Sequence, residues 1–122
     1  MSREEPEGLR RAPVEAVERR DGNVVVRLAG EIDLYNVAEV SSALAQAGRD
    51  ASERLVVDLA EVSFLDSTAL GALLEAERSL RHETRFLLAG PVGEVRRALE
   101  ISGLAQRFEI RDTLEDALAS EG

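Results

Sequence analysis

Three small polar residues, Asp66-Ser67-Thr68, lie where the hydrophobic pattern of the chain changes its period. Each has a side-chain oxygen that can accept a hydrogen bond from the unpaired amides of a first helical turn. The hydroxyl of Ser67 could also act as a nucleophile or carry a phosphate. The question is therefore whether the hydroxyl of Ser67 caps the helix, acts in catalysis or carries a modification.

A buried strand and a helix must position this hydroxyl. The apolar run of residues 55–57 and the alternation of residues 62–65 are typical of a strand, whereas apolar residues recur at helical spacing from Ala69 to Leu80. The sequence therefore predicts a strand that enters a helix through a tight polar junction. At this junction Asp66 is expected to cap the helix.

Three further helices are expected on the basis of spacing and end signals. The first should be capped by Asp33, should include Leu34 on its apolar face and can end at Gly48. The next should begin at a Gly-Pro pair, with Pro91 in the first helical position. The last should begin with a variant of the capping box at Asp112 and run to about residue 120.

Together the patterns predict a single α/β domain. Further strands are expected at residues 14–18, 23–29, 84–89 and 108–110, with a hairpin turn at Asp21-Gly22. The order is β-β-α-β-α-β-α-β-α, with about five strands and about four helices. Such an order predicts a mixed, mostly parallel sheet with the first hairpin as its antiparallel edge. Residues 1–13 are expected to be a flexible tail and residues 14–120 the domain.

The composition limits the classes of partner. A net charge of -9 argues against nucleic acid and against anionic membranes, because both reward clustered cations. The absence of cysteine excludes disulfides and thiolate metal sites, and the only histidine, His82, lacks the spacing of a ligand pair. We expect neither a metal nor a cofactor. With no membrane-length apolar run and no signal peptide, the expected location is the cytoplasm.

Two motifs resemble those of the STAS domain. Gly30-Glu31-Ile32-Asp33 follows a predicted strand, and Phe64-Leu65-Asp66-Ser67-Thr68-Ala69-Leu70-Gly71 spans the strand-to-helix junction. The chain specifically resembles the bacterial anti-sigma factor antagonists, or anti-anti-sigma factors, which control sporulation and general-stress sigma factors. The resemblance covers roughly residues 14–120, and the family's fold has the element order predicted above.

The resemblance implies partner switching controlled by phosphorylation. In the family, the serine that matches Ser67 is phosphorylated by an anti-sigma factor that is itself a serine kinase. The unphosphorylated antagonist binds this kinase and so releases the sigma factor. The phosphorylated antagonist dissociates, and a PP2C-type phosphatase restores it. One departure is Ala69, which stands where the family usually has glycine and whose methyl group would alter the approach of the kinase.

The expected partner-binding residues come from both motifs and are Asp33, Asp66, Ser67, Thr68, Ala69 and Leu70. The protein is expected to be a monomer or weak dimer. Purely structural roles remain open for several of them, since Ser67 and Thr68 suit a helix start and Asp33 suits an N-cap.

Two other classes of function compete with an antagonist. An enzyme is disfavoured because the sequence around Ser67 lacks the flanking glycines of a nucleophile elbow, and His82 comes too early for a hydrolase triad. A constitutive STAS adaptor or scaffold subunit, of the stressosome-associated or transport-associated kind, would have no phosphorylation switch. Transfer of phosphate to Ser67 from a kinase partner discriminates between an antagonist and an adaptor.

Overall fold

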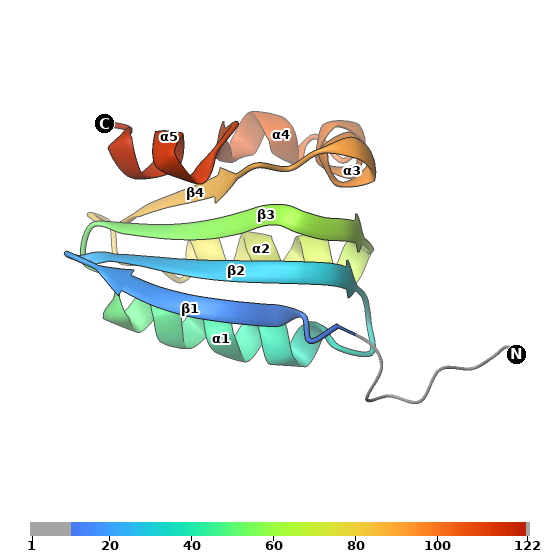
Figure 1. The fold of residues 1–122 in the computed structure, drawn as a ribbon, viewed down its shortest axis with the longest axis horizontal. Coiled ribbons are helices and arrows are strands. Elements are labelled where there is room, and N and C mark those ends of the chain that lie inside the picture. Colours follow the sequence, from blue (N-terminus) through green and yellow to red (C-terminus); the bar gives the residue numbers. More distant parts are fainter. Residues whose placement is uncertain (1–10, 122) are drawn as a thin grey trace, which may run out of the picture.

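Within residues 11–121, which the computed structural model describes, a five-stranded sheet is flanked by helices (Figure 1). The first ten residues of the predicted tail lie outside this range. The elements in chain order are β1 (Val14–Arg20), β2 (Asn23–Ile32), α1 (Val37–Asp50), β3 (Arg54–Leu65), α2 (Ser67–Arg78), β4 (Arg85–Ala89), α3 (Gly93–Ile101), α4 (Leu104–Arg107), β5 (Glu109–Arg111) and α5 (Leu114–Ala119). The predicted order is confirmed, and the short helix α4 is an addition to it.

The sheet has the predicted mixed topology. Its strands lie in the order β1-β2-β3-β4-β5; β1 pairs with β2 in antiparallel orientation, and the other neighbours are parallel. Pro13 precedes β1 and is buried, and its carbonyl accepts a hydrogen bond from the amide of Ala29. Because β2 and β3 are parallel, their carboxyl ends meet at one edge of the sheet.

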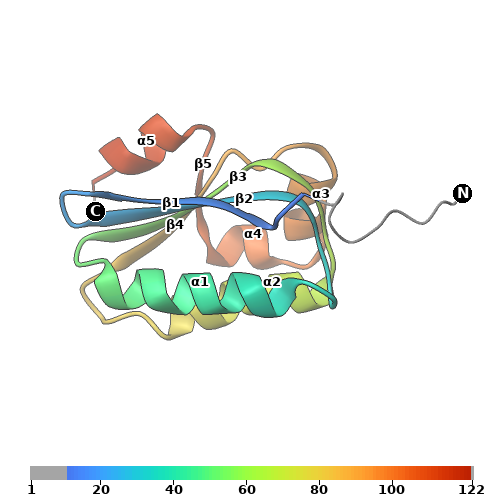
Figure 2. The same ribbon diagram turned by 60° about the horizontal axis from the view of Figure 1, so that its bottom comes forward.

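Period-two alternation divides the apolar side chains of the strands between two faces. Val24, Val26 and Leu28 of β2 belong to the larger core, which also contains buried residues of α1, α2 and α3. Val25 belongs to a smaller core under α5. Figure 2 shows α1 and α2 on one side of the sheet and α5 on the other. The central strands of the sheet are therefore buried, and the helices α1 and α2 lie on the same face of the sheet.

The two sharpest changes of chain direction use backbone conformations with positive φ. At the hairpin turn, Asp21 has φ 50° and Gly22 has φ 89°, which confirms the predicted turn. Near the end of β2, Gly30 has φ 74° where the register with β3 shifts. A shift of this kind is a local bulge, and it redirects the last residues of β2 toward the loop that follows.

Four predicted helix boundaries are wrong, one of them at α5, whose N-cap residue is Thr113 and not Asp112. Helix α1 begins at Val37 with Asn36 as its N-cap residue, because Asp33 and Leu34 form a separate turn. Gly48 lies inside α1; its missing side chain lets Leu80 approach, since a Cβ there would lie 3.1 Å from Leu80 Cδ2. Helix α3 begins only at Gly93, and the buried Pro91 belongs to the loop before it.

The hairpin turn gives a direct test of the backbone argument. Gly22→Ala should lower the free energy of unfolding by about 1–2 kcal/mol, since an L side chain is strained at positive φ and its Cβ would lie 2.9 Å from Ser52 Oγ. Gly71→Ala is the matched control, because Gly71 is helical and a Cβ there would have open space for 4 Å around it. The control should raise stability by up to about 1 kcal/mol. Urea denaturation measures both, and equal effects would contradict the assignment.

Candidate functional site

The strand-to-helix junction predicted from the sequence is present at the end of β3. Asp66 is the N-cap residue of α2, and its Oδ1 accepts a hydrogen bond of 3.0 Å from the amide of Ala69. The same Oδ1 accepts a hydrogen bond of 2.6 Å from the hydroxyl of Thr68. The predicted capping role of Asp66 is therefore confirmed, and Ser67 becomes the first residue of the helix.

The second carboxylate oxygen of Asp66 reaches a different element. Asp66 Oδ2 accepts a hydrogen bond of 3.1 Å from the amide of Leu34, in the loop between β2 and α1. The amide of Asp66 in turn donates to the carbonyl of Ile32, the last residue of β2, at 3.2 Å. Asp66 thus joins the start of α2 to the loop after β2, so the two sequence motifs lie together at one edge of the sheet.

These hydrogen bonds also determine the charge of Asp66. Burial by itself raises the pKa of the carboxyl group, but hydrogen bonds from the Thr68 hydroxyl and from the amides of Ala69, Leu34 and Thr68 outweigh burial. The pKa of Asp66 is therefore lower than its ordinary value of 3.8. The carboxylate next to Ser67 is negatively charged at neutral pH, which suits a helix N-terminus.

The loop between β2 and α1 is a compact turn and not the start of the helix. The amide of Asp33 donates to Asn36 Oδ1 at 2.9 Å, and the amide of Tyr35 donates to Asp33 Oδ1 at 3.0 Å. Asn36 Nδ2 donates to the carbonyl of Glu31 at 2.9 Å. Leu34 and Tyr35 form the exposed tip of the turn. The sequence analysis did not identify Leu34 and Tyr35 as exposed site residues. The polar side chains of Asp33 and Asn36, three positions apart, are nevertheless a sequence signal that favours a turn of this kind.

The two hydroxyl groups at the start of α2 have different surroundings. Both Ser67 and Thr68 are exposed, but Thr68 donates its hydroxyl proton to Asp66 and so contributes to the cap. Ser67 occupies the first helical position, where a substituent on its hydroxyl meets solvent and the positive end of the helix. Of the two, Ser67 is the better placed to carry a modification without loss of the cap.

Ala69, which was expected to lie on the partner-binding surface, has a buried side chain. Its side chain is 2% exposed and lies in the core, on the face of α2 that also buries Leu73 and Ala76. The spacing of these residues places Ala69 on the buried stripe. Leu70 is partly buried and packs against the same core. A methyl group at position 69 therefore fills core space and does not hinder an approaching protein.

The junction does not have the components of a catalytic serine. His82 follows the end of α2, and a helix of 12 residues is about 18 Å long, so the histidine is remote from Ser67. Among residues 11–121, no group of three His, Cys, Asp or Glu side chains could hold a metal ion. In the part of the chain that is described, the site therefore offers a hydroxyl and the ionised carboxylate of Asp66 but no adjacent histidine base and no cluster of metal ligands.

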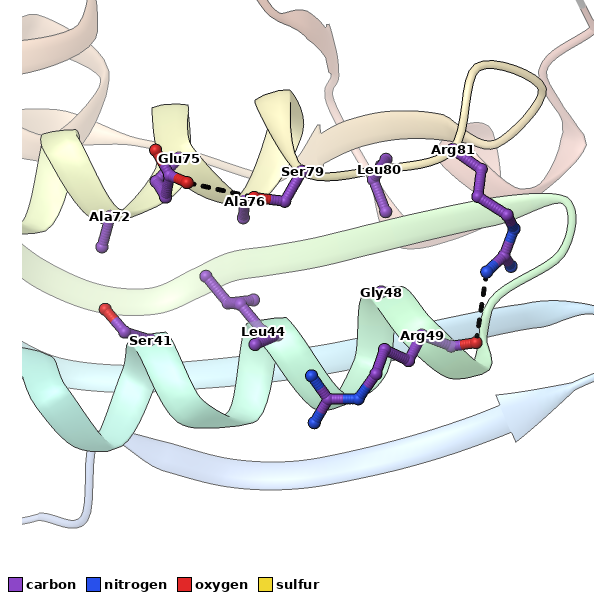
Figure 3. Close-up of a pocket in the computed structure, with 11 residues that line it drawn as sticks. Ser41, Leu44, Gly48, Arg49, Ala72, Glu75, Ala76, Ser79, Leu80 and Arg81 are labelled. Atoms are coloured by element: carbon purple, nitrogen blue, oxygen red, sulfur yellow. Dashed lines mark hydrogen bonds between the residues drawn. The ribbon is translucent and has the colours of Figure 1, made fainter.

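Two hollows of the surface lie away from the junction. A cavity of about 270 Å³ separates α1 from α2, with Leu44, Ala76 and Leu80 among its lining residues (Figure 3). At one end of it, Arg81 donates hydrogen bonds to the carbonyls of Arg49 and Ala51. None of the predicted site residues lines this cavity or the charged one next to β4. Ser67 therefore lies on an open surface, which suits a macromolecular partner better than a small-molecule substrate.

Comparison with protein families identifies the family of the chain. The STAS domain model matches residues 16–117. The chain belongs to the STAS domain family. An anti-sigma-B factor antagonist of Listeria monocytogenes is 36% identical to it over 100 residues, which cover 81% of this chain and 88% of the relative.

Solved structures of STAS proteins agree with this assignment. An anti-sigma factor antagonist from Mycobacterium paratuberculosis superimposes with a TM-score of 0.80 at 35% identity and covers 84% of this chain and 88% of its own. The Bacillus cell fate determinant SpoIIAA in its phosphorylated form superimposes with a TM-score of 0.64 at 26% identity, covering 84% and 95% of the two chains. The STAS fold predicted from the sequence is therefore confirmed.

Family membership also answers the question of catalysis. This STAS protein is related to antagonists of anti-sigma factors, so it is a regulatory protein and not an enzyme. None of the helices within residues 11–121 has both the length and the hydropathy that a membrane span requires.

Removal of the Asp66 carboxylate should destabilise the whole junction. Asp66→Ala should lower the free energy of unfolding by about 1–2 kcal/mol, because the amide of Ala69 loses its cap. Asp66→Asn keeps a capping oxygen and should lower the free energy of unfolding by less than Asp66→Ala does. Urea denaturation at neutral pH measures both variants, and an Asn variant less stable than the Ala variant would contradict the capping role.

Comparison of the wild type with Asp66→Asn also tests the contribution of the Asp66 charge to stability. The folded-state pKa of Asp66 lies below 3.8, so its ionisation stabilises the fold above that pH. The stability advantage of the wild type over Asp66→Asn should therefore be full at neutral pH and should disappear as the pH falls through the lowered pKa. An advantage that does not change with pH would show that the charge contributes nothing.

Ala69→Gly should act on stability and not on recognition. The loss of a buried methyl group and the lower helix propensity of glycine should together lower the free energy of unfolding by roughly 1–2 kcal/mol. Thermal unfolding measures this effect. If Ala69 instead hindered a kinase, Ala69→Gly would raise the rate of phosphorylation with no loss of stability.

Proposed function

We propose that this STAS protein is an anti-sigma factor antagonist whose Ser67 is the phosphorylation site of a partner switch. In its unphosphorylated form it binds an anti-sigma factor with serine kinase activity, and the sigma factor is released. Phosphorylation of Ser67 by that kinase ends the complex, and a PP2C-type phosphatase restores the binding form. The site works in the cytoplasm, where sigma factors act.

The position of Ser67 is the observation that carries the proposal. Ser67 is exposed and is the first residue of α2, directly after the residue that caps the helix. Thr68, by contrast, uses its hydroxyl in the cap. The relation to proteins named anti-sigma factor antagonists, and to SpoIIAA, whose phosphorylated form has been solved, supports regulation of this protein by a phosphate.

Electrostatics explain why a phosphate here would act on the partner and not on the fold. A phosphate at a helix N-terminus meets free amides and the positive end of the helix dipole, so α2 tolerates it. It would add about 1.5–2 negative charges beside the ionised carboxylate of Asp66. A partner surface fitted to a neutral hydroxyl would then face a concentrated negative charge and lose affinity.

The remaining partner-binding residues follow from the same surface. Asp66 and Thr68 form the cap of α2, and Leu70 is partly accessible one turn further along. Asp33 lies in the neighbouring turn, which is joined to Asp66 through the amide of Leu34. A bound kinase covers this edge of the sheet. The side chain of Ala69 packs in the core beneath this surface.

The first test is whether Ser67 accepts a phosphate. The protein, Ser67→Ala and Thr68→Ala should each be incubated with ATP, Mg²⁺ and the candidate anti-sigma kinases of the host, and analysed by intact-mass spectrometry. A single phosphate is expected on the wild type and on Thr68→Ala but not on Ser67→Ala. Tight binding to a kinase without any phosphate would favour a constitutive STAS adaptor instead.

The second test concerns affinity. Ser67→Ala should bind the kinase persistently in the presence of ATP, whereas Ser67→Asp should bind at least about tenfold more weakly, a loss of about 1.4 kcal/mol. Calorimetric titration measures both affinities. Equal affinities of the wild type, Ser67→Ala and Ser67→Asp would contradict a switch based on charge.

A further inference from the structure

Two large apolar side chains are exposed next to the proposed phosphorylation site. Leu34 is 64% exposed and Tyr35 is 87% exposed, and they are consecutive residues at the tip of the turn between β2 and α1. Single exposed apolar residues are common, but an adjacent pair that includes an aromatic ring forms a projecting patch. Because the turn contributes neither side chain to the core, their contribution to folding is small.

The turn holds this pair in a defined position. Its backbone is fixed on both sides by the hydrogen bonds between Asp33 and Asn36, between Tyr35 and Asp33, and between Asn36 and Glu31. A rigid turn presents its side chains with little loss of backbone entropy on binding. Tyrosine adds a large contact area with few rotatable bonds, and it is enriched among the residues that dominate binding energy at protein interfaces.

The patch is also tied directly to the phosphorylation site. The amide of Leu34 donates to Asp66 Oδ2 at 3.1 Å, and Asp66 immediately precedes Ser67. Figure 2 shows that α1 and α2 begin at the same end of the molecule, below the edge where β2 and β3 end. A protein that covers Ser67 must therefore lie against the turn as well.

We infer that Leu34 and Tyr35 form the apolar anchor that holds the anti-sigma kinase over Ser67, with the ring of Tyr35 inserted into an apolar pocket of that kinase. This inference rests on the proposed function and adds the residues that supply its affinity. The anchor is spatially separate from the hydroxyl that carries the phosphate. It fixes where the kinase binds, and the charge at Ser67 decides whether the kinase stays.

A second copy of this chain is a poorer occupant for the patch. The turn is bordered by Glu31, Asp33 and Asp66, and Glu39 lies in the first turn of α1. Two copies that met through this surface would bring like charges together in a protein of net charge -9. The same carboxylates favour a partner with cations around its apolar pocket.

The test measures the affinity of the kinase for variants that cannot be phosphorylated. In a Ser67→Ala background, Tyr35→Ala should weaken binding about 30-fold, equivalent to about 2 kcal/mol, and Leu34→Ala should weaken it by a smaller factor. Tyr35→Phe should retain the affinity, because the ring and not the hydroxyl enters the pocket. Thermal unfolding should be unchanged, since both side chains are exposed.

Ile101→Ala in the same background is the matched control. Ile101 is 73% exposed on α3, which contributes no residue to the site, and its loss should leave the affinity unchanged. Equal effects of Tyr35→Ala and Ile101→Ala on the affinity would overturn the anchor. The proposed function would still hold in that case if the wild type bound the kinase and was phosphorylated on Ser67. A wild type that bound no kinase would overturn both. A wild-type dimer that Tyr35→Ala dissociates in analytical ultracentrifugation would assign the patch to a second copy and overturn the anchor.

Discussion

The carboxylate of Asp66 is the interaction on which the site depends. One of its oxygens caps α2 through the Ala69 amide and the Thr68 hydroxyl, and the other binds the amide of Leu34 in the neighbouring loop. Because all these groups donate to the ionised form, the pKa of Asp66 is lowered and the charge persists at neutral pH. A single side chain thus fixes the start of the helix, the position of Ser67 and the turn that carries Tyr35.

The sheet makes this arrangement possible. Parallel pairing brings the ends of β2 and β3 to one edge, so the loops after the two strands lie next to each other although their residues are far apart in sequence. Both loops lead into helices on the same face, and both helices therefore begin near that edge. The result is an open surface with an exposed hydroxyl, the ionised carboxylate of Asp66 and an apolar projection, which suits reversible recognition of another protein.

The proposed switch at this surface would separate folding from regulation. The core residues of α2, including Ala69, lie on the opposite side of the helix from solvent, and the cap is formed by Asp66 and Thr68 and not by Ser67. A phosphate on Ser67 would consequently leave the packing and the cap in place. Its effect would be confined to whatever protein covers the start of α2, where desolvation and like-charge repulsion act directly.

Sequence alone determined the features that depend on neighbouring residues. The periods of the strands and of α2, the Asp21-Gly22 turn and the capping by Asp66 follow from local hydrogen bonds and from which side chains share a face. Tertiary structure decided the features that depend on distant contacts. Leu34 fits a helical apolar pattern yet is exposed, because its amide binds the carboxylate of Asp66, a residue distant in sequence, within a turn that precedes α1. Likewise, only the packing of α2 against the sheet shows that Ala69 faces inward, since a local pattern shows which residues share a face but not what that face meets.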